Sequence, residues 1–183
     1  MPDLRRAAAI VKRVRRFGAD AKGVAGIEFA ITSTMLAFGL LNAVDLGYYI
    51  YRRMEVENAA DAGAQAAMKT CDQNALPATT NCSELNTAIN AAIHNTSLGT
   101  AVSLAAGYPI EGYYCTNSSN ALQYVSSMSN KPSNCSVVGN ASASPADYLQ
   151  VQVTTPYQPL FGVSVMGALG WTSISMTSWM RMN

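Results

Sequence analysis

The chain has 183 residues, of which 49% are hydrophobic and 13% are charged, and its formal net charge is +1. The usual charged share is about a quarter, and this composition excludes a disordered acidic chain, a collagen repeat and a disulfide-dense miniprotein. The balanced charge does not indicate nucleic-acid binding through a basic surface. With His94 as its one histidine, the sequence also argues against a Ser-His-Asp hydrolase and a histidine-rich metal site.

The basic residues are concentrated at the start of the chain. Residues 1–23 contain seven of the twelve basic residues and two acidic residues, whereas residues 24–183 contain five basic and nine acidic residues. This asymmetry beside an apolar segment follows the positive-inside rule, so we expect residues 1–23 to form a cytoplasmic leader and the later part to be exported. A nucleic-acid-binding tail is the alternative for a basic arm. The apolar segment at its edge favours the leader.

An uncharged apolar segment follows the basic arm. Residues 29–44 contain no charge, and extension to 24–51 adds Glu28 and Asp45, one near each end. A spanning helix needs about 20 residues, and carboxylates near its ends can reach headgroups or water. An interfacial belt and a return to water are indicated by Tyr48, Tyr49, Tyr51, Arg52 and Arg53. We therefore predict a transmembrane helix over residues 24–51.

A cleaved secretory signal is the alternative for this region. The basic arm is long, and small residues suited to signal peptidase occur only at 59–67, beyond several charged residues. Such a cut would fall far outside the membrane, so we expect the segment to remain as a membrane helix.

The junction between the arm and the apolar segment has a specific order of residues. Gly23 closes the arm, four small or apolar residues follow, and Glu28 and Phe29 begin the hydrophobic helix. Farther along come an acidic residue before a glycine and an Asn-Ala-Ala stretch, at Asp45, Gly47 and 58–67. Together these features resemble type IV prepilins of the tight-adherence (Tad/Flp) systems, and within them the TadE-like minor pilins or pseudopilins.

This resemblance implies that a membrane-embedded prepilin peptidase cuts between Gly23 and Val24. Glu28 then becomes the fifth residue of the mature chain. In a helix bundle of low dielectric, the new ammonium of one subunit and Glu28 of its neighbour attract each other. We expect this pair to set the axial register between subunits, with Phe29 in the same assembly region. An uncleaved anchor whose Glu28 snorkels to the interface is the alternative.

The predicted helix continues beyond the membrane. No proline occurs between residues 24 and 68, and the later part is rich in good helix formers, so we expect an exported continuation over 52–69. At ~1.5 Å per residue the whole helix would be on the order of 65 Å long. Small residues recur every fourth position at Gly39, Ala43 and Gly47, which favours close approach of another helix. The alanine-rich stretch 59–67 offers a low-relief surface to a sheet or to neighbouring subunits.

Residues 70–183 are expected to form an exported domain. Four cysteines on the exported side favour disulfides, and no C-x2-C spacing supports the rival zinc site. Of the three possible pairings we expect the one that closes the smallest loops, Cys71–Cys82 and Cys115–Cys135. The segment between the first two cysteines contains a proline and is predicted to be a loop. A short helix that ends before Gly99 is predicted, with Ser83 as its N-cap, an apolar face over residues 85–93 and His94, without a catalytic role, in its last turn.

The rest of this domain is predicted to alternate between strands and loops. Alternating or β-prone residues predict strands at 101–106, 111–116, 148–155 and 171–180. Residues 117–143 are rich in Ser and Asn and predict a surface loop. Residues 156–170 are apolar but diluted by Gly, Ser and Pro, so we expect a connecting loop or short helix, and a candidate assembly surface, rather than a second membrane span.

These patterns predict an α+β fold with a long N-terminal helix packed on a small antiparallel sheet and one additional short helix. The expected function is that of a minor pilin or pseudopilin of a Tad-type pilus. We expect the chain in the bacterial inner membrane, with its later part in the periplasm or, within a pilus, outside the cell. The alternative function is an uncleaved single-pass envelope or adhesion protein.

The expected partners are other pilins, which bind through the N-terminal helix, the prepilin peptidase and the inner membrane. No cofactor, metal, nucleic acid or small-molecule substrate is expected. An enzyme is the third hypothesis, and the sequence offers no nucleophile–base pair, carboxylate pair or metal-ligand spacing in its favour.

Overall fold

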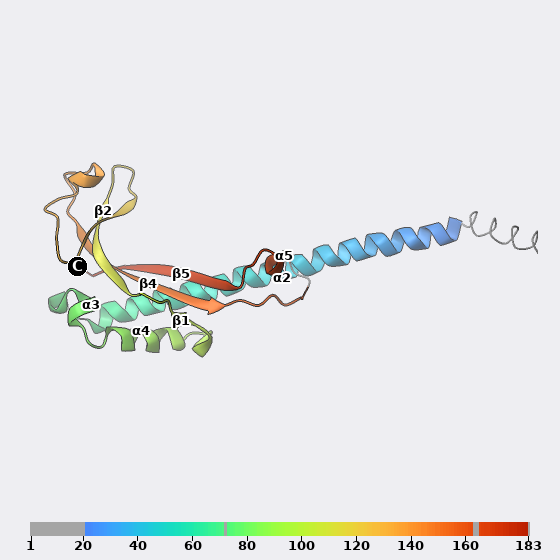
Figure 1. The fold of residues 1–183 in the computed structure, drawn as a ribbon, viewed down its shortest axis with the longest axis horizontal. Helices are drawn as coiled ribbons and strands as arrows, with labels where there is room; N and C mark the ends of the chain where they lie inside the picture. The colour runs from blue at the N-terminus through green and yellow to red at the C-terminus, as the bar shows by residue number, and fades with distance from the viewer. Residues whose placement is uncertain (1–20, 72, 163–164, 183) are drawn as a thin grey trace, which may run out of the picture. The chain divides into compact units, whose positions relative to one another are not determined.

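The computed structural model describes residues 21–71, 73–162 and 165–182 (Figure 1). The predicted cytoplasmic leader, apart from its last three residues, lies outside the described residues. The chain divides into two compact units, residues 1–45 and 46–183. Helix α2, Ala21–Thr70, contributes residues to both units. Its span agrees with the long helix predicted from the absence of proline.

In the N-terminal unit, the first half of α2 is apolar and mostly exposed. Asp45 at its end is fully buried, so the expectation that this carboxylate reaches headgroups or water was wrong. In the most apolar stretch of 18 residues, no residue is buried within the protein. The polar side chains in this stretch bond to the helix itself: Thr32 Oγ1 donates to the carbonyl of Glu28 at 2.8 Å, and Thr34 Oγ1 to that of Ala30 at 2.7 Å. Hydroxyls satisfied in this way are tolerated in lipid. The helix is therefore long and apolar enough to cross a membrane.

In the C-terminal unit, residues 46–70 of α2 pack against the sheet and against helix α4, Leu85–His94. The buried side chains of α2 are mostly small, namely Val56, Ala59, Ala60, Ala64 and Ala67. Ile89 and Ile93 from α4 and Leu149, Val151 and Val153 from the sheet complete the centre of the core. The alanine-rich stretch thus serves core packing, one of the two uses expected for it.

Gly63 marks the closest approach between these layers. A Cβ atom at this position would lie 3.1 Å from Ile93 Cγ2, 3.2 Å from Val151 Cγ1 and 3.3 Å from Ile89 Cγ2. Interiors are close-packed, so there is little room for an added side chain. The small residue lets α2 lie against both α4 and the sheet.

The sheet has five antiparallel strands: β1 (Ser103–Leu104), β2 (Ile110–Thr116), β3 (Leu122–Ser127), β4 (Ala146–Pro156) and β5 (Ser173–Arg181). Strand β4 is central. It pairs with β5 along one edge and with β2 and β1 along the other, while β3 pairs with β2. Alternate side chains of β4 are buried, as its sequence predicts. The α+β fold with a long helix on a small antiparallel sheet is confirmed.

Three local predictions were wrong. Strand β3 lies inside the predicted surface loop 117–143, after a turn in which Asn117 Oδ1 accepts hydrogen bonds from the amides of Ser119 and Ala121, both at 2.9 Å. Helix α4 is preceded by Glu84, not by Ser83, and no side chain caps it. The loop predicted between the first two cysteines contains the one-turn helix α3, Ala78–Asn81.

The remaining elements are short. Three 3-10 turns occur in the described part of the chain, at Gln73–Ala75, Gly99–Ala101 and Ser136–Val138. Helix α5, Val165–Ala168, lies within the apolar connection between β4 and β5, where a loop or short helix was expected. Two disulfides, Cys71–Cys82 and Cys115–Cys135, join neighbouring cysteines in sequence order, with Cα–Cα distances of 5.7 and 5.6 Å.

Candidate assembly site

The expected processing site lies at the start of the described helix. Gly23 and Val24 belong to the first turn of α2, and both are exposed. No atom lies within 4 Å of the position that a Cβ of Gly23 would occupy. This peptide bond is therefore accessible, but it has to leave the helix to bind a protease in extended form.

Glu28 and Phe29 follow one turn later on the same exposed helix. Phe29 is 75% exposed, the largest exposure among the large hydrophobic residues of this helix. Among the described residues, none forms an ion pair with Glu28. An acidic side chain beside apolar ones in lipid is unfavourable unless it meets a cation or water. The Glu28 carboxylate is therefore free to meet a cation of another molecule.

The stripe of small residues is open along its length. Gly39, Ala43 and Gly47 are all exposed, and nothing lies within 4 Å of a Cβ at either glycine. Residues four positions apart share one side of a helix. The backbone of another helix can therefore approach this side closely.

The residues expected at the membrane interface divide into two groups. Tyr51 and Arg53 are exposed. Tyr48 and Tyr49 are instead half-buried by the connection between β4 and β5. The ring of Tyr49 lies 5.1 Å from that of Tyr157, edge to face, and 5.0 Å from that of Trp171. Sequence reasoning missed this packing, because it joins segments about a hundred residues apart.

Arg52 is anchored rather than free to reach outward. Its guanidinium lies 3.0 Å from Glu55 Oε2, and Ser97 Oγ donates to Glu55 Oε1 at 2.8 Å. Burial opposes ionisation of Glu55, but the hydrogen bonds from Ser97 and Arg52 outweigh it and hold the pKa of this carboxyl below its ordinary value. The group fixes the end of α4 to α2 just beyond the predicted span.

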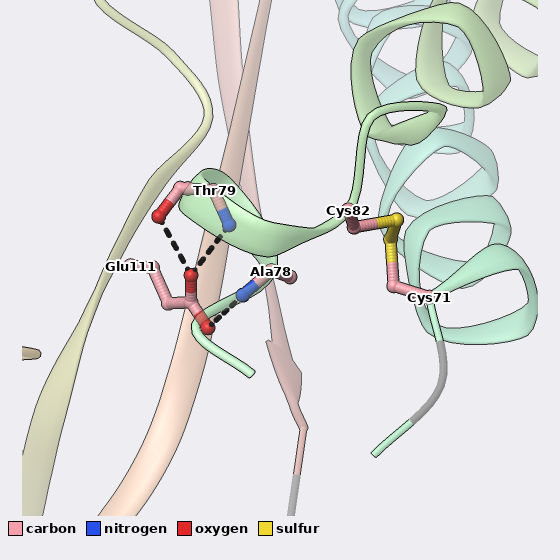
Figure 2. The surroundings of a disulfide bond; sticks show 5 residues. All are labelled: Cys71, Ala78, Thr79, Cys82 and Glu111. Carbon is pink, nitrogen blue, oxygen red and sulfur yellow. Dashed lines mark hydrogen bonds between the residues drawn. A yellow bond between two sulfur atoms is a disulfide. The ribbon is translucent and has the colours of Figure 1, made fainter. Parts of the chain in front are cut away.

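A second fixed point lies where α2 ends. The Cys71–Cys82 disulfide joins the end of α2 to the segment that contains α3 (Figure 2). Glu111 of β2 accepts three hydrogen bonds from this segment: 2.9 Å from the Ala78 amide, 2.8 Å from the Thr79 amide and 2.7 Å from Thr79 Oγ1. A carboxylate that accepts amide protons at a helix start is favourable. The disulfide and Glu111 therefore hold α3 from two sides.

Glu111 also has an acidic neighbour, which the sequence analysis did not find. Tyr113 of β2 is opposite Asp147 of β4, and Glu111 is opposite Leu149, so both carboxyl groups lie on one face of the sheet. Asp147 is fully buried and Glu111 is 8% exposed. Only the strand register reveals the pair, since the two residues are far apart in the sequence.

The environment of Asp147 favours its protonated form. Burial and the nearby charge of Glu111 raise the pKa of Asp147 from 3.8 to about 7, and the charge of Lys131 opposes the rise. Burial and the same two carboxyls also raise the pKa of Tyr113. Lys131 Nζ lies 5.6 Å from the centre of the Tyr113 ring. Glu111 thus holds α3, and Asp147 lies fully buried beside it.

No group of three or more His, Cys, Asp or Glu residues in the described part of the chain is arranged to hold a metal ion. Gly23, Glu28 and the small-residue stripe all lie at exposed positions of α2.

Comparison with known proteins agrees with this picture. A family described as TadE-like protein matches residues 23–65. Neither the curated proteins nor the solved structures contain a significant match to the chain. The matched segment begins at Gly23 and includes Glu28 and the small-residue stripe. Residues 23–65 are therefore a TadE-like segment, which confirms the resemblance seen in the sequence and supports association of this protein with a Tad pilus.

Proposed function

We propose that this chain is a minor pilin or pseudopilin of a Tad/Flp-type pilus. Its precursor is anchored by α2 and is cut by a prepilin peptidase between Gly23 and Val24. The observation that carries the proposal is that the TadE-like match begins at Gly23 and runs along a helix whose apolar side chains are exposed. In water such a helix is unfavourable, whereas in a membrane or a helix bundle it is covered.

Cleavage changes the electrostatics of packing. Residues 1–23 carry a net charge of +5, so uncut precursors packed side by side repel one another through their leaders. The cut removes this repulsion and leaves a single ammonium at Val24. Opposite unit charges 4 Å apart attract by about 4 kcal/mol at an effective dielectric constant near 20. The ammonium of one subunit and Glu28 of the next then set the axial register of the bundle.

The remaining assembly contacts follow from shape. The stripe of Gly39, Ala43 and Gly47 accepts a neighbouring helix at close distance. Phe29 and the other exposed apolar side chains fill the space around it. The leader faces the cytoplasm and the C-terminal unit faces the oxidising side of the membrane, where its two disulfides are stable.

The cleavage step is tested with two matched variants, Gly23→Val and Gly26→Val, expressed in the native host. Both glycines are exposed and neither has an atom near the added Cβ, so the two changes disturb the fold equally little. We expect Gly23→Val to accumulate at full length without supporting pili, while Gly26→Val is still cut. Intact mass and pilus counts by electron microscopy are the measurements. If both variants and the unmodified chain stay at full length, the chain is an uncleaved single-pass envelope protein.

The role of Glu28 is tested separately. Glu28→Gln keeps the shape and polarity of the side chain but removes its charge. We expect normal cleavage after Gly23 and a loss of pili of about tenfold or more, the effect of removing over 1.4 kcal/mol per subunit contact. Glu57→Gln, which changes an exposed glutamate beyond the predicted span, is the matched control and should assemble normally. Normal assembly of Glu28→Gln would contradict the charge pair.

A further inference from the structure

The connection between β4 and β5 carries an exposed apolar surface that the proposed function does not use. This apolar loop is defined here by its described residues, 157–162 and 165–172. It contains no charged residue. Its exposed large hydrophobic side chains are Leu160 (53%), Val165 (46%), Leu169 (60%) and Trp171 (40%). Side chains of this size gathered on one exposed segment mark an interaction surface.

The apolar loop is fixed at its base rather than hanging free. The Tyr157 amide donates to the Thr172 carbonyl at 2.9 Å, and the Trp171 amide donates to the Met166 carbonyl at 3.2 Å. Tyr157 is buried against the rings of Tyr48 and Tyr49, with centroid distances of 6.1 and 5.1 Å. The loop is therefore attached to one particular level of α2, that of Tyr48 and Tyr49.

The sequence of α2 determines how far Tyr48 and Tyr49 lie from the uncharged apolar stretch. Tyr48 comes four residues after Val44, the last residue of the uncharged stretch. Four helical residues rise only about 6 Å, which is roughly the depth of the headgroup region on one side of a bilayer. Because Tyr157 packs on Tyr48 and Tyr49, a span that ends near Val44 brings the base of the apolar loop to the membrane surface.

The residues around the loop follow the order of a membrane interface. A hollow of about 360 Å³ beside its base is lined by Tyr48, Arg52, Pro156, Tyr157 and Gln158. Aromatic rings prefer the boundary between acyl chains and headgroups, and arginine prefers the headgroups themselves. The rings of Tyr48 and Tyr157 and the ion-paired Arg52 thus lie together at the base of the uncharged loop. This favours a lipid surface over a second copy of the chain as the partner of the loop.

We propose that the apolar loop is a second membrane contact, which inserts Leu160, Val165, Leu169 and Trp171 into the leaflet nearest the C-terminal unit. The inference rests on the membrane anchor in the proposed function but not on cleavage or pilus assembly. The contact fixes the orientation of the C-terminal unit on the bilayer before assembly. A subunit that leaves the membrane for a pilus has to withdraw this loop from the lipid.

The two tryptophans provide a matched test in the full chain. Trp171 lies in the apolar loop at 40% exposure, and Trp179 lies near the far end of β5 at 45% exposure. Trp179→Phe leaves Trp171 as the reporter, and Trp171→Phe leaves Trp179. A third variant, Trp171→Phe/Trp179→Phe/Phe38→Trp, reports on the anchor. Each is placed, one copy per disc, in phosphatidylcholine nanodiscs with and without bromine near the headgroup end of the acyl chains.

Bromine quenches a tryptophan that lies in the acyl region. We expect an emission loss of about twofold for Trp171, the value for a ring at the interface, and no loss for Trp179. The reporter at position 38 should be quenched as well. Quenching at position 38 without quenching of Trp171 overturns the loop contact and leaves the anchor intact. Absence of quenching at position 38 overturns the anchor, and the loop contact with it.

A further variant separates insertion from simple proximity. Leu169→Asp places a charge at the most exposed position of the loop, and Lys69→Asp places one on exposed α2 far from it. With Trp171 as the reporter, Leu169→Asp should abolish the quenching and Lys69→Asp should preserve it. Equal quenching in both variants would show that Trp171 is near lipid without insertion of the loop, and would overturn the proposal.

Discussion

Asp147 of β4 lies beside Glu111 of β2 on the buried face of the sheet, and the two carboxyl groups differ in their interactions. Glu111 accepts three hydrogen bonds from Ala78 and Thr79 and so fixes α3 to the sheet. Two buried charges side by side would repel each other, and burial disfavours a charge. Asp147 is the group whose pKa is raised, to about 7. Below that pH Asp147 therefore keeps its proton beside Glu111.

The first prediction concerns pH. The pKa of Asp147 is raised from 3.8 to about 7, so between these values the folded chain keeps a proton that the unfolded chain releases. The free energy of unfolding should then fall as the pH rises through this window and level off above it. In Asp147→Asn the fall should be much smaller. Thermal unfolding of the detergent-solubilised full chain at a series of pH values measures it. Equal slopes for both chains would contradict the assignment.

The second prediction concerns the fixation of α3. Glu111→Gln removes the charge that three donors share, and hydrogen bonds to charged groups contribute roughly 1.5–3 kcal/mol each. We expect a loss of about 2 kcal/mol in the free energy of unfolding. Glu57→Gln, at an exposed position of α2, should change it by less than about 0.5 kcal/mol. Urea unfolding followed by circular dichroism gives both values, and equal effects would show that Glu111 does not hold α3.

The third prediction concerns the disulfides. Cys71 and Cys82 are 11 residues apart, and Cys115 and Cys135 are 20 apart. Replacing either pair by serine should lower the free energy of unfolding by about 2–4 kcal/mol. Only the Cys71–Cys82 loop contains α3, so only its removal should couple to Glu111→Gln. A double-mutant cycle measures this coupling, and the Cys115–Cys135 pair is the control. Additive effects for both pairs would contradict a shared role.

The fourth prediction concerns the small-residue stripe. Gly39→Leu adds bulk where a neighbouring helix is proposed to approach, whereas Ala37→Leu adds bulk on another side of the same helix. We expect Gly39→Leu to abolish pili at an unchanged protein level and Ala37→Leu to retain them. Pilus counts and immunoblots of the membrane fraction are the measurements. Assembly by Gly39→Leu would show that this side of α2 faces lipid.

Much of the fold could be predicted because local patterns determine it. The absence of proline from Val24 to Met68 gives α2, and the alternation of Leu149, Val151 and Val153 gives β4. Strand β3 was missed because its surroundings are rich in Ser and Asn, and its pairing with β2 outweighs that composition. Ser83 was a reasonable cap by residue type, but the chain enters α4 in helical conformation at Glu84.

The candidate site likewise has features that could be predicted from the sequence and features that could not. Gly23, Glu28 and the stripe are local features of one helix and could be found from the sequence. The contact of Glu111 with Asp147 and that of Tyr49 with Trp171 depend on strand register and on how the β4–β5 connection folds back. No periodicity along the chain encodes such long-range relationships. The sequence therefore indicates what the helix can do, and the structure adds which distant segments pack together within the C-terminal unit.

The central claim is that a membrane-anchored precursor becomes an assembly subunit when its basic leader is removed. The most direct measurement is the N-terminal residue of the protein isolated from the envelopes of pilus-producing cells. The account predicts a chain that starts at Val24, with the leader absent from the assembled fraction. Recovery only of chains that still carry residues 1–23 would contradict it, and would leave a tethered domain that is never built into a pilus.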